Sequence, residues 1–309
     1  MNRLATFVPF APLLGSVTLF AMANPPAPPP AAAEAYRVDV ESWRAAREAR
    51  LRAPDGWLTV VGLLWLAPGA NRFGSAPDNE VRLPGGAPAH AGTLVVANGK
   101  VSVAVPAGSP LTMNGRPAQS RAVHTDAEPE PDVFGFASLT WQVIARGDRL
   151  GVRVRDRDNP ARKTCPPPRW YPIAPAYRVV ARLTPRVGSA ELVVPDATGG
   201  KQTLRSPGTL TFTLAGATQH LDPVLDGDDA ADQLVVFRDL TTAHETYGAG
   251  RFVRALRQAD GTFVLDFNRA YSPPCALTPH ATCPLPPPQN RLRISVEAGE
   301  KNRAEAPPP

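Results

Sequence analysis

From residue 58 onward, this chain consists largely of short segments rich in Val, Leu, Ile, Phe and Thr, separated by glycine, proline or asparagine. Such segments are typical of β-strands, and they do not alternate with helical patterns as α/β folds require. Asn98-Gly99 between two of them is the signal of a type I′ hairpin. The pattern therefore predicts an all-β fold of two packed β-sandwich or barrel units. The expected strands span residues 58–66, 93–97, 100–105, 138–145, 151–155, 177–184, 191–194, 210–214, 234–237, 263–268 and 292–297.

One short helix is expected near the N-terminus. Val40, Trp43, Arg47 and Leu51 recur at helical spacing, and the alanines among them favour a helix. The Pro-Asp-Gly sequence at 54–56 forms a turn and should end this helix.

The first 23 residues have the pattern of a secretory signal peptide. Arg3 supplies a positive charge, residues 4–22 are apolar and uncharged, and Ala21-Met22-Ala23 forms a small-residue cleavage site. A retained membrane anchor is the alternative, although Pro9 and Pro12 disfavour a stable spanning helix. Cleavage predicts a periplasmic or secreted protein without a further membrane span.

Composition divides the chain into five parts. A Pro/Ala-rich linker at 24–35 follows the signal peptide at 1–23. The helix and a β-sandwich unit are expected over 36–158, and a second β unit over 159–299. The boundary falls at an Asp-Asn-Pro sequence, and the proline-ended tail at 300–309 is expected to be disordered.

The basic balance of the chain does not indicate a nucleic-acid partner. Lys and Arg number 33 against 28 Asp and Glu, a net charge of +5 that falls to +4 when Arg3 is removed. The positive residues are spread along the chain, and no basic run is interleaved with aromatic residues. Arginine predominates over lysine, which favours bidentate contacts with carboxylates or phosphates. The oligomeric state stays open.

Residues 265–292 combine an acid, an amide, arginines, a phenol and two cysteines with many prolines. Proline fixes φ and removes a backbone donor, so this stretch should form neither a helix nor a central strand. Pre-set bends lower the entropy lost on ordering, which suits a rigid loop that presents polar groups. Strand alternation over 263–268 places Asp266 and Asn268 on the face opposite Phe263, Leu265 and Phe267.

The cysteines indicate a disulfide bond more than a metal site. In an oxidising compartment, Cys275 and Cys283 are natural disulfide partners, and Cys165 would remain a buried free thiol. Zinc or copper held by the pair with His280 and Asp266 is the alternative. We expect no bound metal and no cofactor.

Five strings occur in the order GWLTVVGLLWLAPGANRFGS, RDRDNPARK, WYPIAPAYRV, ETYGAGRF and DFNRAYSPPCALTPHATCPLPPPQNRL. They resemble a bacterial family known as domain of unknown function 1684, over most of the chain after the signal. The family carries no established activity, so the resemblance implies membership and no mechanism. Cys165, Ser272 and His280 depart from the family's usual residues, which argues against a role that depends on these side chains.

A second resemblance concerns the first half alone. RFGSAPDNEVRLP, followed by Ala89-His90 and Asn114-Gly115, is similar to forkhead-associated domains, β-sandwiches that bind phosphopeptides. The Gly-Arg-Ser start and the Ser before the His of those domains are missing here. The resemblance implies a β-sandwich without phosphothreonine binding.

The polar residues of the second half predict a ligand site that binds an anionic or polyhydroxyl small molecule, such as a glycan. Arginine would pair with anionic groups, Asp and Asn would bond hydroxyls, and Trp170 would add flat apolar contact along with the aromatic side chain at 271. The expected ligand-binding residues are Tyr247, Arg251, Asp266, Asn268, Arg269 and Tyr271.

Two alternatives remain open for these residues. A hydrolase could use Asp266 or Glu245 as general base with Arg251 as electrostatic stabiliser, although no nucleophile motif identifies catalytic residues. A purely structural envelope protein would use the same groups as an internal Asp–Arg pair and an Asn that bonds loop backbone.

Overall fold

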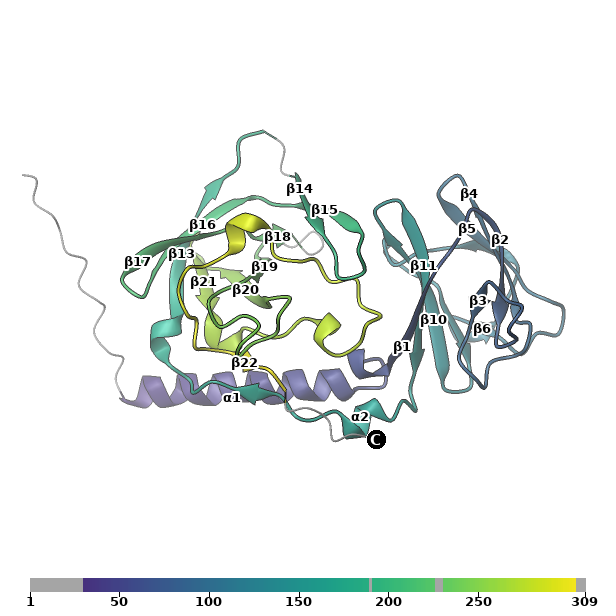
Figure 1. Ribbon diagram of the computed structural model, residues 1–309, viewed down its shortest axis with the longest axis horizontal. Helices are drawn as coiled ribbons and strands as arrows, with labels where there is room; N and C mark the ends of the chain where they lie inside the picture. Colours follow the sequence, from purple (N-terminus) through teal and green to yellow (C-terminus); the bar gives the residue numbers. More distant parts are fainter. Residues whose placement is uncertain (1–29, 189–190, 226–229, 304–309) are drawn as a thin grey trace, which may run out of the picture.

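The computed structural model describes residues 30–188, 191–225 and 230–303. Within these ranges strands dominate, and they form two β units preceded by the helix α1 (Pro30–Arg52) (Figure 1). The predicted all-β fold with an N-terminal helix is confirmed. The expected signal peptide lies outside the described residues, as do positions 24–29 of the expected linker.

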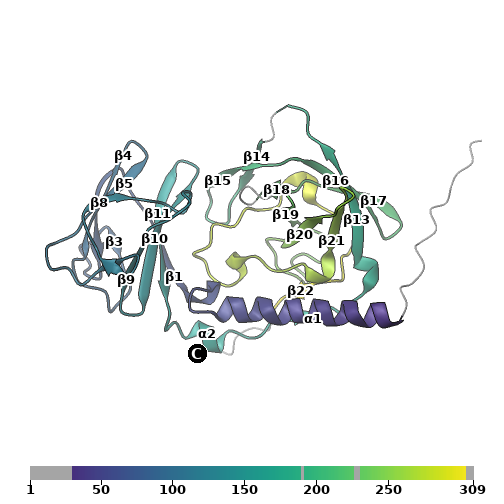
Figure 2. The same ribbon diagram turned by 180° about the vertical axis from the view of Figure 1, so that it is seen from behind.

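Helix α1 is longer than the expected helix, because it begins within the segment assigned to the linker. Its buried residues Val40, Arg47 and Leu51 follow helical spacing, as predicted. Figures 1 and 2 show the helix lying along the C-terminal unit, whereas the chain that follows it enters the N-terminal unit. The expected grouping of the helix with residues up to 158 therefore does not hold for its packing.

The N-terminal unit contains two antiparallel-rich sheets that pack around one apolar core. A six-stranded sheet has the order β1-β11-β10-β9-β6-β7, and a five-stranded sheet has the order β3-β2-β4-β5-β8. The rings of Phe134 and Trp141 stack at 5.8 Å in this core, with Phe73 against both. The predicted hairpin at Asn98-Gly99 is confirmed, since both residues have positive φ. The elements are η1 (Trp57–Thr59), β1 (Val60–Trp65), β2 (Gly69–Gly74), β3 (Val81–Arg82), β4 (Gly92–Ala97), β5 (Lys100–Ala104), β6 (Thr112–Met113), β7 (Arg116–Pro117), β8 (Arg121–Val123), β9 (Val133–Phe136), β10 (Leu139–Arg146) and β11 (Arg149–Asp156).

The C-terminal unit is built on a seven-stranded sheet of order β17-β16-β13-β21-β20-β19-β18. Two small sheets, β14-β15 and β12-β22, accompany it, and a second apolar core covers one of its faces. The elements are α2 (Ala161–Thr164), β12 (Arg169–Trp170), η2 (Pro175–Tyr177), β13 (Arg178–Pro185), β14 (Glu191–Pro195), β15 (Lys201–Arg205), β16 (Gly208–Leu214), β17 (Ala217–Leu221), β18 (Val224–Leu225), β19 (Asp232–Phe237), β20 (Arg251–Arg257), β21 (Phe263–Asp266), η3 (Phe267–Arg269), η4 (Pro274–Ala276), η5 (Pro288–Asn290) and β22 (Glu300–Lys301).

The proline-rich segment behaves as its composition predicts. After β21 ends at Asp266, the chain up to position 292 forms only three short 3-10 turns and isolated bridges. The expected disulfide bond is not formed, since Cys275 and Cys283 are free thiols. They are nevertheless neighbours, because the backbone N of Cys275 donates to Sγ of Cys283 at 3.3 Å. Cys165 is also free, but it is half-buried rather than buried.

The expected disorder from position 300 is wrong for the first residues of the tail. Glu300 and Lys301 form β22, which pairs with Trp170 and Arg169. Glu300 is fully buried and accepts two hydrogen bonds from the guanidinium of Arg47 in α1. The last described residues therefore hold the helix against the C-terminal unit. Positions 304–309 lie outside the described residues.

No helix within the described ranges is long and apolar enough to cross a membrane.

Candidate functional site

Arg251 lies in the core and cannot reach a ligand at the surface. Its side chain has no exposed area, and its guanidinium donates to the carbonyls of Ala298 and Val296. It also forms an ion pair with Asp239 at 3.3 Å. Burial lowers the pKa of Arg251, and the Asp239 carboxylate opposes that effect. These contacts fix the segment after position 296 to β20.

Asp266 and Asn268 form hydrogen bonds within the loop that follows β21. Internal bonds of this kind are what a purely structural role of these residues predicts. Oδ1 of Asp266 caps η3 by accepting from the backbone N of Asn268 at 3.1 Å. The same oxygen accepts from the hydroxyl of Tyr36 at 2.9 Å. The amide of Asn268 is buried, and it bonds both backbone groups of Ala174. Burial raises the pKa of Tyr36, and the Asp266 carboxylate raises it further. Asn268 thus joins the helix, the loop and η2.

The two predicted tyrosines lie apart from this loop closure. The hydroxyl of Tyr247 donates to the carbonyl of Cys275 at 2.9 Å, and burial raises its pKa. Tyr271 pairs with Phe252 through two backbone hydrogen bonds, and the guanidinium of Arg47 lies 4.3 Å from the centre of its ring. Both tyrosines therefore bind the proline-rich segment to its surroundings.

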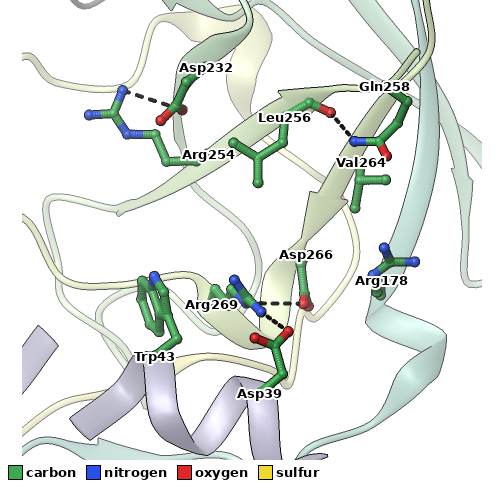
Figure 3. A pocket seen from close by; sticks show the side chains of 10 residues that line it. All are labelled: Asp39, Trp43, Arg178, Asp232, Arg254, Leu256, Gln258, Val264, Asp266 and Arg269. Carbon is green, nitrogen blue, oxygen red and sulfur yellow. Dashed lines mark hydrogen bonds and ion pairs between the residues drawn. The ribbon is translucent and has the colours of Figure 1, made fainter. Parts of the chain in front are cut away.

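Asp266 and Arg269 alone of the predicted set line a pocket of about 470 Å³ between α1 and the outer face of the seven-stranded sheet. We call this space the helix pocket (Figure 3). Its ten lining residues are Asp39, Trp43, Arg178, Asp232, Arg254, Leu256, Gln258, Val264, Asp266 and Arg269.

Strand alternation places these side chains on one face. Val264 and Asp266 of β21 line the helix pocket, while Phe263 and Leu265 are buried in the core on the other side. This confirms the predicted face for Asp266, whereas Asn268 lies beyond the strand and is buried in η3. Arg178 of β13 lies directly opposite Asp266 in the register of the sheet. The helix contributes one wall through two residues that are one turn apart, at positions 39 and 43.

Most charges in the helix pocket are already paired. Arg269 pairs with Asp39 and, at 3.5 Å, with Asp266 (Figure 3). Arg254 lies 3.7 Å from Asp232. Arg178 differs from these two, because its exposed guanidinium has no hydrogen bond or ion pair with any residue in the described part of the chain. The pocket thus contains one available cationic group.

The residues expected for hydrolysis do not converge. Glu245 does not line the helix pocket, and its carboxylate binds Lys301 at 2.6 Å. The hydrogen bond from Lys301 lowers the pKa of Glu245, which makes it a weaker base. Oδ1 of Asp266 already accepts hydrogen bonds from the backbone N of Asn268 and from the hydroxyl of Tyr36. No group of three or more His, Cys, Asp or Glu side chains suited to a metal ion occurs among the described residues.

Several pocket residues could not be identified from the motifs. Asp39 and Trp43 belong to the helix, which sequence order assigned to the other unit. Arg178 ends the WYPIAPAYR string, but nothing in that string shows that β13 pairs with β21. Trp170, expected at the site, instead packs beside Trp43 at 6.1 Å, with the guanidinium of Arg44 at 4.6 Å from its ring centre.

The fold and the pocket define an all-β protein of two units, with a polar pocket between its helix and its C-terminal sheet. Residues 168–301 match the model of the family described as "Protein of unknown function (DUF1684)", and this part of the chain belongs to that family. The family resemblance is thereby confirmed for the C-terminal unit. The first two of the five strings and the forkhead-associated likeness lie outside the match and stay predictions.

The solved structures include a similar chain, an uncharacterized protein of Haloarcula marismortui studied by NMR in solution. It is 34% identical, and the similarity covers 45% of this chain and 77% of that one, with a TM-score of 0.37. No curated protein matches the chain.

Proposed function

We propose that the helix pocket binds a small polyhydroxyl ligand that carries an anionic group. The observation that carries this proposal is the guanidinium of Arg178, which has no partner among the described residues, beside charges that are otherwise paired. Arg269 and Arg254 already have carboxylate partners. An anionic group can therefore bind Arg178 with a charge-assisted hydrogen bond and displace no existing ion pair.

The other walls suit the hydroxylated part of such a ligand. Trp43 offers a flat apolar surface of the kind that covers a sugar ring. Asp232 and Gln258 carry oxygen atoms that accept hydrogen bonds from hydroxyl groups. The volume of about 470 Å³ lies within the range of roughly 300–1,000 Å³ usual for small-molecule sites. We also propose a periplasmic or secreted location, as residues 1–23 indicate.

Isothermal titration calorimetry with glucuronate and glucose tests this function. We expect glucuronate to bind more tightly than glucose, because only glucuronate carries an anion for Arg178. In Arg178→Ala, glucuronate should bind about tenfold or more weakly, since a hydrogen bond to a charged group contributes about 1.5–3 kcal/mol.

Arg182→Ala is the matched control. Arg182 is exposed on the same strand and does not line the helix pocket, so its loss should leave glucuronate binding unchanged. Equal affinity of the Arg178→Ala variant and the unaltered protein for glucuronate would overturn the proposal. So would the absence of any binding at millimolar glucuronate.

A further inference from the structure

A second pocket lies between the two β units, away from the helix pocket. Its volume is about 510 Å³, and we call it the inter-unit pocket. Arg146 of β10 and Arg153 of β11 line it from the N-terminal unit, and Thr282 lines it from the proline-rich segment. Its lining contains two guanidinium groups and a single carboxylate, that of Asp126.

Arg146 is fully neutralised by this carboxylate. Its guanidinium donates to Asp126 through two nitrogen atoms, at 3.0 and 2.7 Å. Its Nε donates to the hydroxyl oxygen of Thr282 at 2.8 Å. Arg146 therefore completes a bidentate pair and has little capacity for another anion.

Arg153 has no such partner. Only 5% of the residue is exposed, and its one side-chain hydrogen bond among the described residues runs to the hydroxyl oxygen of Thr282, at 3.1 Å. Its Nε is buried without a hydrogen-bond partner, and no carboxylate lies within ion-pair distance in the described part of the chain. The ring of Trp57 lies 5.2 Å away and supplies a cation–π contact, which does not neutralise the charge of Arg153.

Burial without a carboxylate partner among the residues that the structure describes disfavours the charged form of the Arg153 guanidinium, which is reflected in its pKa. Burial and, to a smaller extent, the nearby charge of Arg146 together lower the pKa of Arg153 to about 10. A buried charge is ordinarily paired and hydrogen-bonded, because desolvation without compensation is unfavourable. Here the hydrogen-bond donors of Arg153 adjoin an open space of molecular size.

We propose that the inter-unit pocket binds an organic anion, whose oxyanion group pairs with Arg153 and whose apolar body lies against the C-terminal unit. A planar carboxylate or a phosphate matches the donor geometry of a guanidinium. Apolar walls for the body come from Trp57, Leu234, Phe252 and Pro274. The ligand would contact both units and supply the counter-charge that Arg153 lacks among the described residues.

Benzoate and phenyl phosphate are suitable probes, because each joins an oxyanion to an apolar ring. We expect one of them to bind in calorimetry and to raise the melting temperature of the intact protein, and the stronger binder identifies carboxylate or phosphate as the preferred group. Benzamide, the neutral analogue of benzoate, should bind at least tenfold more weakly. Equal binding of benzamide and the preferred anion, or no binding of either anion at millimolar concentration, overturns the proposal.

Arg153→Met locates the site. Methionine keeps an apolar side chain of similar length, so the variant should lose at least tenfold in affinity for the preferred probe. Its melting temperature without ligand should be unchanged or higher, because a buried unpaired charge has been removed. Unchanged probe affinity in this variant contradicts the proposal. Arg153→Gln serves in its place if the methionine variant does not fold.

Arg178→Ala separates this site from the helix pocket. That variant should bind benzoate or phenyl phosphate as the unaltered protein does, because Arg178 does not line the inter-unit pocket. Conversely, Arg153→Met should leave glucuronate binding unchanged. Loss of benzoate or phenyl phosphate binding in Arg178→Ala assigns the probe to the helix pocket and overturns the inference about the inter-unit pocket.

Discussion

Arginine residues in this protein occupy three different environments, which predict three different effects of substitution. Arg251 is buried, bonded to two carbonyls and paired with Asp239. Arg153 is buried with one hydrogen bond to a neutral hydroxyl. Arg178 is exposed at the rim of the helix pocket. Burial and pairing, rather than residue type, decide whether an arginine supports the fold or is available to a ligand.

Arg251→Ala should destabilise the protein by about 3–5 kcal/mol, because breaking a buried ion pair leaves an uncompensated charge on Asp239. Urea denaturation measures the change in the free energy of unfolding. Arg257→Ala, on the exposed end of the same strand, should change this free energy by less than about 0.5 kcal/mol. Similar values for the two variants would contradict the structural role of Arg251.

The carboxylate of Asp196 should make the free energy of unfolding decrease as the pH falls into the acid range. Burial raises its pKa, but hydrogen bonds from Thr198 and Gly200 and the charge of Arg149 outweigh burial and hold the pKa below its ordinary 3.8. A carboxyl whose pKa is lower in the folded state stabilises that state above its unfolded pKa. This contribution is lost as the pH falls below 3.8 through the folded pKa.

In Asp196→Asn, the free energy of unfolding should therefore fall by about 1–3 kcal/mol at neutral pH. The difference from the unaltered protein should narrow in acid, because that protein then loses the same contribution. Urea denaturation at about pH 7 and about pH 3 checks this expectation. A difference that stays constant between the two conditions would show that the Asp196 carboxylate does not titrate as described.

At the scale of secondary structure, helix α1 is the element that joins distant parts of the chain. Arg47 bonds Glu300 of β22 and the carbonyl of Ser272, while Tyr36 bonds Asp266. The helix itself was predictable from its apolar spacing. Its partners were not, because they lie more than 200 positions away and no local pattern specifies them. The same reason explains why the pocket residues Asp39 and Trp43 escaped sequence analysis.

The coupling between Arg47 and Glu300 can be measured with a double-mutant cycle. Both side chains are buried, and the guanidinium lies 3.0 Å from the carboxylate. We expect the sum of the destabilisations caused by Arg47→Met and Glu300→Gln to differ from the destabilisation of the double variant by about 0.5–3 kcal/mol. The reason is that the free-energy changes of substitutions at contacting residues are not additive. Additive effects would indicate that helix docking does not depend on this ion pair.

The region around β21 shows which structural features can be predicted from local sequence patterns alone. Alternation in 263–266 correctly placed Asp266 opposite the core, since one buried face fixes the register of a strand. The prolines after it correctly excluded regular structure up to position 292. Asn268, however, turned inward with η3, where a side-chain cap changes the direction of the chain. The buried amide of Asn268 donates to Tyr36 and Ala174, which are distant in the sequence and which alternation cannot reveal.

At the scale of the whole molecule, each unit has its own apolar core, and Trp57 of η1 packs against a third, smaller cluster in the C-terminal unit. One core contains Phe134 and Trp141, and the other contains Phe237 and Phe267. Between the units, Arg146 and Arg153 donate to the hydroxyl oxygen of Thr282, and Trp57 adds apolar packing beside them. Polar interfaces between units resemble transient contacts, and they permit the units to unfold separately.

Calorimetry should therefore resolve two thermal transitions. Phe134→Leu removes packing in the N-terminal core and should lower only one of them, while Phe237→Leu should lower only the other. A single transition that both substitutions shift equally would show that the two cores unfold as one cooperative unit.

The position of α1 also determines the order in which parts of the molecule can fold and dock during synthesis. A chain is synthesised from its N-terminus, and domains generally fold as units while it emerges. The N-terminal unit has all its strands once Asp156 has been made. The helix precedes that unit in the chain, yet its buried ion-pair partner, Glu300, belongs to the last described strand. The earliest described element of this protein must therefore wait until Glu300 has been made before its buried ion pair can form, so its docking is completed only after the strands of both units are available.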